Sequence, residues 1–314
     1  MSFKLNPDVG RPEDLLDYSI RVLNGNPAAA HWRHAPDASS FDDGAAFRII
    51  RAAVSEQRND PQHLRRTAGE VAALLPAERS AEALASLWGL FISLAQQTPS
   101  GNIAMLDLVV LLDHLALSPK TAATVVVTVG DVQLMVWQDG FEQISRLHGL
   151  DRCIRECMVS PYVSDEVTST LTRWINLNAF AALLWSYNLV DGRDHAVQQL
   201  RSAFEDRRSS DVGDRAAADA RVVAAAQWAE HACQRLYHLS VTSSGEETTG
   251  TKAKLWRPGA RFKGRAGFSF QRWEFWQAAF EEAHEFGSGG AEAKVEAGAA
   301  SGMMEKVLYA GFEG

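Results

Sequence analysis

Apolar side chains recur three and four positions apart along most of this 314-residue chain, and this spacing limits its possible folds more than any other feature. In an α-helix such positions share one face, which a globular protein buries. The spacing and the Ser, Pro and Gly residues at segment ends predict helices over 12–23, 45–58, 62–75, 80–98, 103–117, 165–187, 194–207, 216–239, 273–286 and 291–309, with short ones over 141–147 and 152–158. We therefore expect an all-α protein, an irregular multi-helix bundle of about ten helices with no substantial sheet.

Two segments depart from this regular pattern. The β-branched run at 124–129 favours a strand, but no obvious partner strand follows, so we expect residues 121–129 to be irregular, and the structure of 121–136 as a whole stays open. Glycines at 287–290 precede the last predicted helix and make 287–314 a hinged C-terminal helix. Because no repeat and no clear linker divides the sequence, residues 1–314 are predicted to form one domain.

The charge balance argues against several classes of protein. The chain has 39 acidic and 31 basic residues, and its net charge of −8 disfavours wholesale binding to nucleic acid or an anionic membrane. The first residues lack the apolar core of a signal peptide, and the longest uncharged stretch, 83–106, is too interrupted to span a bilayer. Three cysteines suit a reducing compartment better than a disulfide framework. We predict a cytoplasmic protein without a membrane anchor.

A long basic loop is predicted over 240–267, and its composition is the most unusual in the chain. Residues 252–272 contain seven basic side chains, no acidic one, and the aromatic residues Trp256, Phe262, Phe268 and Phe270. A loop of this length usually has a function. Basic groups beside aromatic rings suit a phosphate, a carboxylate or single-stranded nucleic acid, of which the global charge disfavours the last. The alternative is a basic loop that lies over an acidic body.

One polar residue interrupts the apolar face of the helix predicted over 165–187. Asn178 lies on the same face as Trp174 and Trp185, where an apolar side chain is expected. A buried amide is costly unless it forms hydrogen bonds. Asn178 therefore either fastens a neighbouring helix or loop, or orients a ligand in a pocket that Trp174 helps to line.

The helix predicted over 216–239 carries a polar stripe beside its apolar one. Gln227, His231 and Arg235 belong to the polar stripe, and Trp228 belongs to the apolar stripe. Histidine suits acid–base chemistry near neutral pH, so His231 and Arg235 are catalytic candidates. Gln227 and Trp228 are substrate-binding candidates. The alternative is an ordinary solvated helix face.

Aromatic residues follow the basic loop at helical spacing. Trp273 and Trp276 share one face of the helix predicted over 273–286. Such a stripe is typical of a hydrophobic core. It also suits the apolar wall of a ligand pocket, so both residues are substrate-binding candidates.

The familiar motifs of nucleotide and metal chemistry are missing from the sequence. It has no nucleotide-binding glycine motif, no nucleophile elbow and no paired-histidine zinc motif. Cys153 and Cys157 lie one helical turn apart, but a zinc ion would need further ligands from distant positions. We therefore predict no cofactor and no metal site.

Three stretches together resemble a known family: WINLNAFAA at 174–182, the segment 224–237 that begins AAAQW, and GFSFQRWEFW at 267–276. They are similar to helical proteins of filamentous fungi that are catalogued only as a domain of unknown function. The likeness extends over residues 139–286. The resemblance implies a fungal, mostly helical, intracellular protein, and it implies no established chemistry and no catalytic residue.

Two classes of function stay open. The first is binding of an apolar or anionic small molecule, with or without catalysis by a cofactor-free cyclase or isomerase of specialised metabolism. Asn178 and Gln227 would orient the ligand, His231 or Arg235 would supply acid–base or anion stabilisation, and the pocket walls would be Trp174, Trp228, Trp273 and Trp276. The second is a non-catalytic interaction or scaffold protein that binds a protein partner through the basic loop and the C-terminal helix. We expect no nucleic-acid and no membrane partner.

Overall fold

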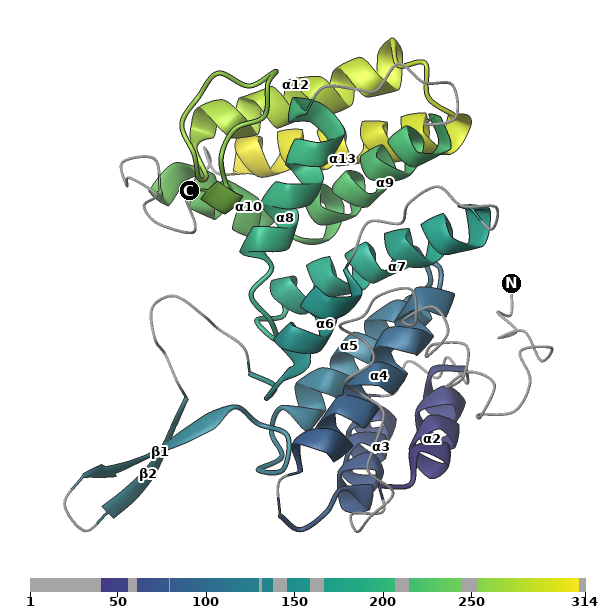
Figure 1. Cartoon of the computed structure of the whole chain (residues 1–314), viewed down its shortest axis with the longest axis vertical. Coiled ribbons are helices and arrows are strands. Elements are labelled where there is room, and N and C mark those ends of the chain that lie inside the picture. The colour runs from purple at the N-terminus through teal and green to yellow at the C-terminus, as the bar shows by residue number, and fades with distance from the viewer. Residues whose placement is uncertain are drawn as a thin grey trace. The chain divides into compact units, whose positions relative to one another are not determined.

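The computed structural model describes residues 41–55, 61–78, 80–129, 132–137, 146–158, 167–206, 215–243 and 254–310. Within these ranges the chain forms eleven α-helices, one π-helical turn and one two-stranded sheet (Figure 1). The prediction of an all-α protein with no substantial sheet is therefore confirmed. The helix predicted over 12–23 and most of the short one over 141–147 lie outside the described residues.

Contacts divide the chain into two compact units. The first comprises residues 1–160 and 187–191, and the second comprises residues 161–186 and 192–314. The assignment of 1–314 to one domain stays a prediction. None of the described helices combines the length and the apolarity that crossing a membrane requires.

Two strongly apolar helices, α4 and α5, supply much of the core of the first unit. A side-chain oxygen caps the N-terminus of each helix: Ser80 Oγ accepts from the Ala83 amide, and Asn102 Oδ1 accepts from the Ala104 amide. The helices of this unit are α2 (Asp43–Ser55), α3 (Pro61–Leu74), α4 (Ala81–Gln97), α5 (Ile103–Leu115) and α6 (Leu150–Cys157).

Long side chains tie these helices to the connecting segments. The fully buried Trp88 of α4 donates a hydrogen bond from Nε1 to the His148 carbonyl oxygen, 2.9 Å away and just before α6. Lys120 Nζ donates to the carbonyl oxygens of Ala72 and Leu75, at 3.1 and 2.6 Å, where α3 ends. A cation at a helix C-terminus satisfies carbonyl groups that have no partner within the helix.

The segment expected to be irregular instead forms an antiparallel hairpin of β1 (Thr124–Val129) and β2 (Val132–Trp137). Its register pairs Thr124 with Trp137 and Val129 with Val132. The β-branched run does form a strand, and the expectation that it has no partner is wrong. Gly130-Asp131 between the two runs is a turn signal that predicts such a hairpin.

The second unit contains α7 (Val167–Ser186), α8 (Arg193–Leu200), the π-helical turn η2 (Arg201–Glu205), α9 (Arg215–His231), α10 (Cys233–Thr242), α12 (Phe270–Glu285) and α13 (Ala291–Ala310). The helix predicted over 216–239 is two helices, because Ala232 leaves helical geometry at φ −124° and ψ 22°. After this break, Tyr237 of α10 packs edge-on against the Trp273 ring of α12, with centroids 5.3 Å apart.

The C-terminal helix α13 packs closely against α12 and α9 (Figure 1). The Lys294 carbonyl oxygen accepts a hydrogen bond from His284 Nδ1 of α12, at 2.9 Å. A β-carbon added at Gly298 would lie 2.7 Å from the same His284 nitrogen, so glycine permits this close approach. The hinge that the sequence predicts before this helix stays a prediction.

The three cysteines lie in packed regions, and they give a test of the fold. Burial raises the pKa of Cys153 and of Cys233 to about 12, and that of Cys157 to about 11. At such pKa values very little of the reactive thiolate form is present at neutral pH. We expect Ellman's reagent at pH 8 to react slowly with the native chain and rapidly with all three thiols in guanidinium chloride. Stoichiometric reaction of the native protein within a minute would contradict this packing.

Candidate functional site

Asn178 and Trp228 form a buried hydrogen-bonded pair between α7 and α9. The Asn178 amide Nδ2 donates to the Trp174 carbonyl oxygen, and its Oδ1 accepts from Trp228 Nε1, each at 2.9 Å. Both side chains are fully buried. The amide therefore satisfies the Trp228 N–H group inside the core. These contacts match the fastening interpretation of Asn178, while its role toward a ligand stays a prediction.

Aromatic packing continues from Trp228 toward the start of α8. The Trp228 ring lies 6.0 Å from the Trp185 ring and 6.3 Å from the His195 ring, centroid to centroid. A β-carbon at Gly192 would lie 2.7 Å from both tryptophan rings, so this position accepts only glycine without rearrangement. Trp174 packs on the other part of α9, against Ala220 and Ala224.

Trp273 and Trp276 are also fully buried, and their neighbours differ from those of Trp228. Trp273 packs against Tyr237, as described above, whereas the Trp276 ring lies 6.5 Å from the Phe268 ring. Trp276 Nε1 donates a hydrogen bond to Glu205 Oε1 at 2.8 Å. Of the four tryptophans predicted to wall one pocket, Trp174 and Trp228 share hydrogen bonds with Asn178, Trp273 contacts Tyr237, and Trp276 contacts Phe268 and Glu205. Their role as pocket walls stays a prediction.

Gln227 lies beside a pair of carboxyl groups between α9 and α13. Its Nε2 donates to Glu296 Oε2 at 2.9 Å. Glu230 lies one turn along the same face of α9, and burial, the Glu296 charge and a hydrogen bond with Glu296 raise the Glu230 pKa to about 7. No pattern in the sequence singled out Glu230 or Glu296.

The two catalytic candidates have different environments. Burial lowers the pKa of His231, and its Nε2 has no hydrogen-bond partner among the described residues. Arg235 lies beyond the break at Ala232, and its guanidinium donates to the Ser186 carbonyl oxygen at 3.3 and 3.4 Å, where α7 ends. His231 is therefore on α9 with Gln227 and Glu230, whereas Arg235 caps the C-terminus of α7.

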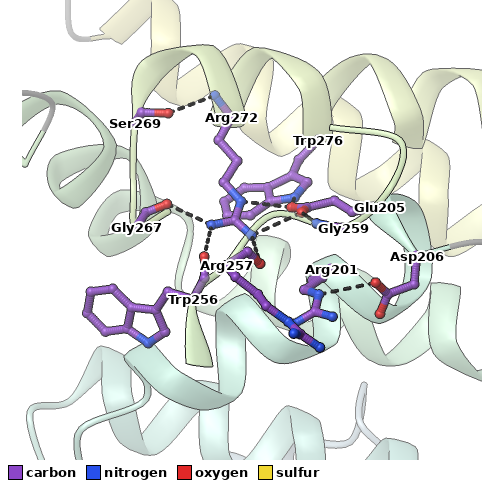
Figure 2. Close-up of polar contacts among 10 residues, drawn as sticks. All are labelled: Arg201, Glu205, Asp206, Trp256, Arg257, Gly259, Gly267, Ser269, Arg272 and Trp276. Atoms are coloured by element: carbon purple, nitrogen blue, oxygen red, sulfur yellow. Dashed lines mark hydrogen bonds and ion pairs between the residues drawn. The ribbon is translucent and has the colours of Figure 1, made fainter. Parts of the chain in front are cut away.

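A buried ion pair that no sequence pattern predicted organises residues 256–267, the described part of the predicted basic loop that it contacts; residues 244–253 of that loop lie outside the described residues. Arg272 of α12 and Glu205 of the π-helical turn are both fully buried, and they lie 67 positions apart. Arg272 Nε donates to Glu205 Oε1 at 2.8 Å, and one terminal nitrogen donates to Oε2 at 3.0 Å (Figure 2). This two-point geometry is the strongest arrangement of an arginine and a carboxylate.

The rest of the Arg272 guanidinium binds the backbone of the loop (Figure 2). It donates to the carbonyl oxygens of Trp256 at 2.9 Å, Gly267 at 2.8 Å and Arg257 at 3.4 Å. Together with the bonds to Glu205, these contacts use all five N–H donors of the guanidinium. Its central carbon also lies 5.1 Å from the centre of the Trp276 ring, within cation–π distance.

Glu205 fixes the loop from the other side. Its Oε2 accepts from the Gly259 amide and its backbone oxygen accepts from the Arg261 amide, each at 2.8 Å. A β-carbon at Gly259 would lie 2.5 Å from the Glu205 carbonyl carbon, so glycine is required for this approach. Trp256 adds a further contact, because its Nε1 donates to Asp194 Oδ1 at 2.7 Å.

The loop presents basic side chains outward from this fixed backbone. We call residues 254–265 the cationic loop; its exposed basic residues are Lys254, Arg257, Arg261, Lys263 and Arg265. Arg261 donates to the Phe204 carbonyl oxygen at 3.3 Å and lies 3.5 Å from Glu282. In the part of the chain that the structure describes, the other four have no ion-pair partner. Within the same part, no group of three His, Cys, Asp or Glu side chains could hold a metal ion.

Substitution of Arg272 tests the structural role of the ion pair. Arg272→Met leaves the Glu205 charge buried without compensation, and we expect it to lower the free energy of unfolding by about 3–5 kcal/mol. Arg265→Met, which removes an exposed arginine, should change that energy by less than about 0.5 kcal/mol. Urea unfolding followed by tryptophan fluorescence measures both. Equal stability of the two variants would show that the pair does not support the fold.

The Glu230 carboxyl group predicts a pH dependence. Its folded-state pKa of about 7 exceeds the unfolded value of 4.5, so the stability it contributes is present below pH 4.5 and is lost as the pH rises toward 7. Glu230→Gln removes this titration. As the pH rises from 5 to 7.5, the free energy of unfolding of the native chain should therefore fall relative to that of Glu230→Gln. Glu292→Gln, at an exposed site, is the control and should show the same dependence of stability on pH as the native chain. If Glu230→Gln also shows that same dependence, the prediction is wrong.

A family model described as "Protein of unknown function (DUF3632)" matches residues 88–280. Searches of curated proteins and of solved structures find no match to the chain. The matched region exceeds half of the chain and includes Asn178, Glu205 and Arg272. It also confirms the sequence resemblance to a domain of unknown function. The chain belongs to the DUF3632 family of proteins of unknown function.

Proposed function

We propose that this chain is a non-catalytic interaction protein that binds a protein partner through the cationic loop. One observation carries the proposal: buried groups fix the backbone of the loop while five basic side chains stay exposed. A surface that is already ordered loses little conformational entropy when it binds a partner. The Arg272–Glu205 pair therefore gives the loop the rigidity that an interaction surface needs.

Four of the six predicted substrate-binding residues have polar groups that are already hydrogen-bonded, which supports an interaction function, whereas the buried Nε1 atoms of Trp174 and Trp273 have no hydrogen-bond partner among the described residues. Asn178, Gln227 and Trp276 each form a hydrogen bond within the chain, to Trp228, Glu296 and Glu205 respectively. A polar group that already has a buried partner must exchange it before it can bind a ligand. Among the described residues, the exposed cations of the loop other than Arg261 carry no such cost.

A second candidate is the small-molecule function, with or without cofactor-free cyclase or isomerase chemistry. The observation that favours it is the group formed by Gln227, Glu230 and Glu296 beside His231. Here burial and a neighbouring charge raise the pKa of Glu230 to about 7, a value suited to proton transfer at neutral pH. A carboxyl group that exchanges a proton at this pH could act as a general acid or base.

A cytoplasmic location belongs to the proposal as well. The three cysteines are free thiols, which suits a reducing compartment. The fungal origin rests on the sequence resemblance, and a role in specialised metabolism rests on analogy alone.

Native mass spectrometry of the protein purified from its own organism separates the two candidates. We expect a complex with one protein partner at fixed stoichiometry, because the proposed surface is preorganised for such binding. A chain that carries a bound small molecule at unit stoichiometry and no partner would overturn the interaction proposal and favour the second candidate. Protein expressed in an unrelated host and purified in the same way is the control for adventitious binding.

A further inference from the structure

We propose that the cationic loop binds an acidic segment of a protein, in which Asp or Glu residues flank an apolar side chain. The inference rests on the proposed interaction function and specifies the chemistry of the partner. Three properties of the loop carry it: the sign and exposure of its charges, the fixed geometry of its backbone, and an exposed leucine among the cations.

The charges of the loop all have the same sign. No acidic residue occurs between Lys254 and Trp273. Among the described residues, Lys254, Arg257, Lys263 and Arg265 are exposed and have no ion-pair partner. Like charges within one short loop repel one another, and binding of carboxylates relieves that repulsion.

The backbone that holds these cations is fixed at several points. Arg272 binds the carbonyl oxygens of Trp256 and Arg257, and the Glu205 carboxylate binds the Gly259 amide. Trp256 and Phe262 are buried on either side of these contacts. The spacing between the cations is therefore set by folding, and it favours a partner whose carboxylates match it.

Leu255 distinguishes the loop from a purely electrostatic patch. Its side chain is 41% exposed and lies between Lys254 and the buried Trp256. An exposed apolar side chain beside cations suits a segment that offers an apolar residue together with its acids. A polyphosphate has no group that would use Leu255.

The charge of the whole chain favours a short acidic segment over a nucleic acid. The net charge is −8 although the loop is strongly basic, so the remainder of the chain is more acidic than that total. A long polyanion that extends beyond the loop would approach this acidic remainder and be repelled. An acidic peptide of about ten residues extends at most about 35 Å and can remain on the loop.

The test measures binding of a defined probe to the full chain by fluorescence anisotropy. The probe is a fluorescein-labelled ten-residue peptide of glutamates with one central leucine, at 50 mM salt. We expect saturable binding that weakens as salt rises and that falls at least tenfold in the double variant Lys263→Glu, Arg265→Glu. The control is Arg65→Glu, Lys306→Glu, which changes the net charge equally at exposed sites outside the loop. Circular dichroism establishes that both variants fold.

Several outcomes would overturn the inference. Absence of peptide binding, or an equal loss in the loop variant and the control, would show that the loop is not the site. Tighter binding of a ten-nucleotide single-stranded DNA, or of phosphatidylserine vesicles, with the same sensitivity to the loop variant would assign the surface to another partner. A peptide in which glutamine replaces every glutamate should not bind.

The proposed function can fail or stand separately from this inference. If the loop variant loses its stoichiometric partner in native mass spectrometry but the glutamate peptide does not bind the native chain, the inference is wrong and the interaction function stands. If the loop variant retains that partner, both are wrong. If no protein partner is found and the glutamate peptide does not bind, both are wrong.

Discussion

The arrangement of the second unit around the basic loop depends on the buried contact between Arg272 and Glu205. Removing two charges from water is costly, and the interior compensates only if every hydrogen-bonding group finds a partner. Here the guanidinium uses all five donors, and the carboxylate accepts from Arg272, Trp276 and the Gly259 amide. The pair thereby links α12, the π-helical turn and the loop, and it accounts for the glycine at position 259.

The same contact separates two kinds of basic residue that look alike in the sequence. Arg272 is buried and structural, whereas Lys263 and Arg265 on the loop are exposed and available to a partner. The proposed function depends on this division, because exposed cations on an unfixed loop would have to be ordered before they could bind. Glu230, whose pKa is raised by burial and by the neighbouring Glu296 charge, lies elsewhere in the unit, on α9.

Local patterns predicted most of the helices but not the contacts between distant segments. The spacing of Trp174, Asn178 and Trp185 specifies one face of α7, and Asn178 does lie in the core there. The hairpin partner at 132–137 escaped prediction, although a Gly-Asp turn signal precedes it. The pairing of Glu205 with Arg272 spans 67 positions, and no periodicity links them. Arg272 looks like one more cation of a basic loop until folding places a buried carboxylate beside it.

Hydrogen exchange of the loop amides tests most directly whether the buried pair fixes the loop. The Gly259 and Arg261 amides donate to Glu205, so they should exchange slowly in the native chain although the surrounding side chains are exposed. In Arg272→Lys, which keeps the charge but loses the planar fork, both amides should exchange at least tenfold faster, while amides of α4 and α5 in the first unit keep their rates. Unchanged protection of Gly259 and Arg261 in that variant would contradict the account.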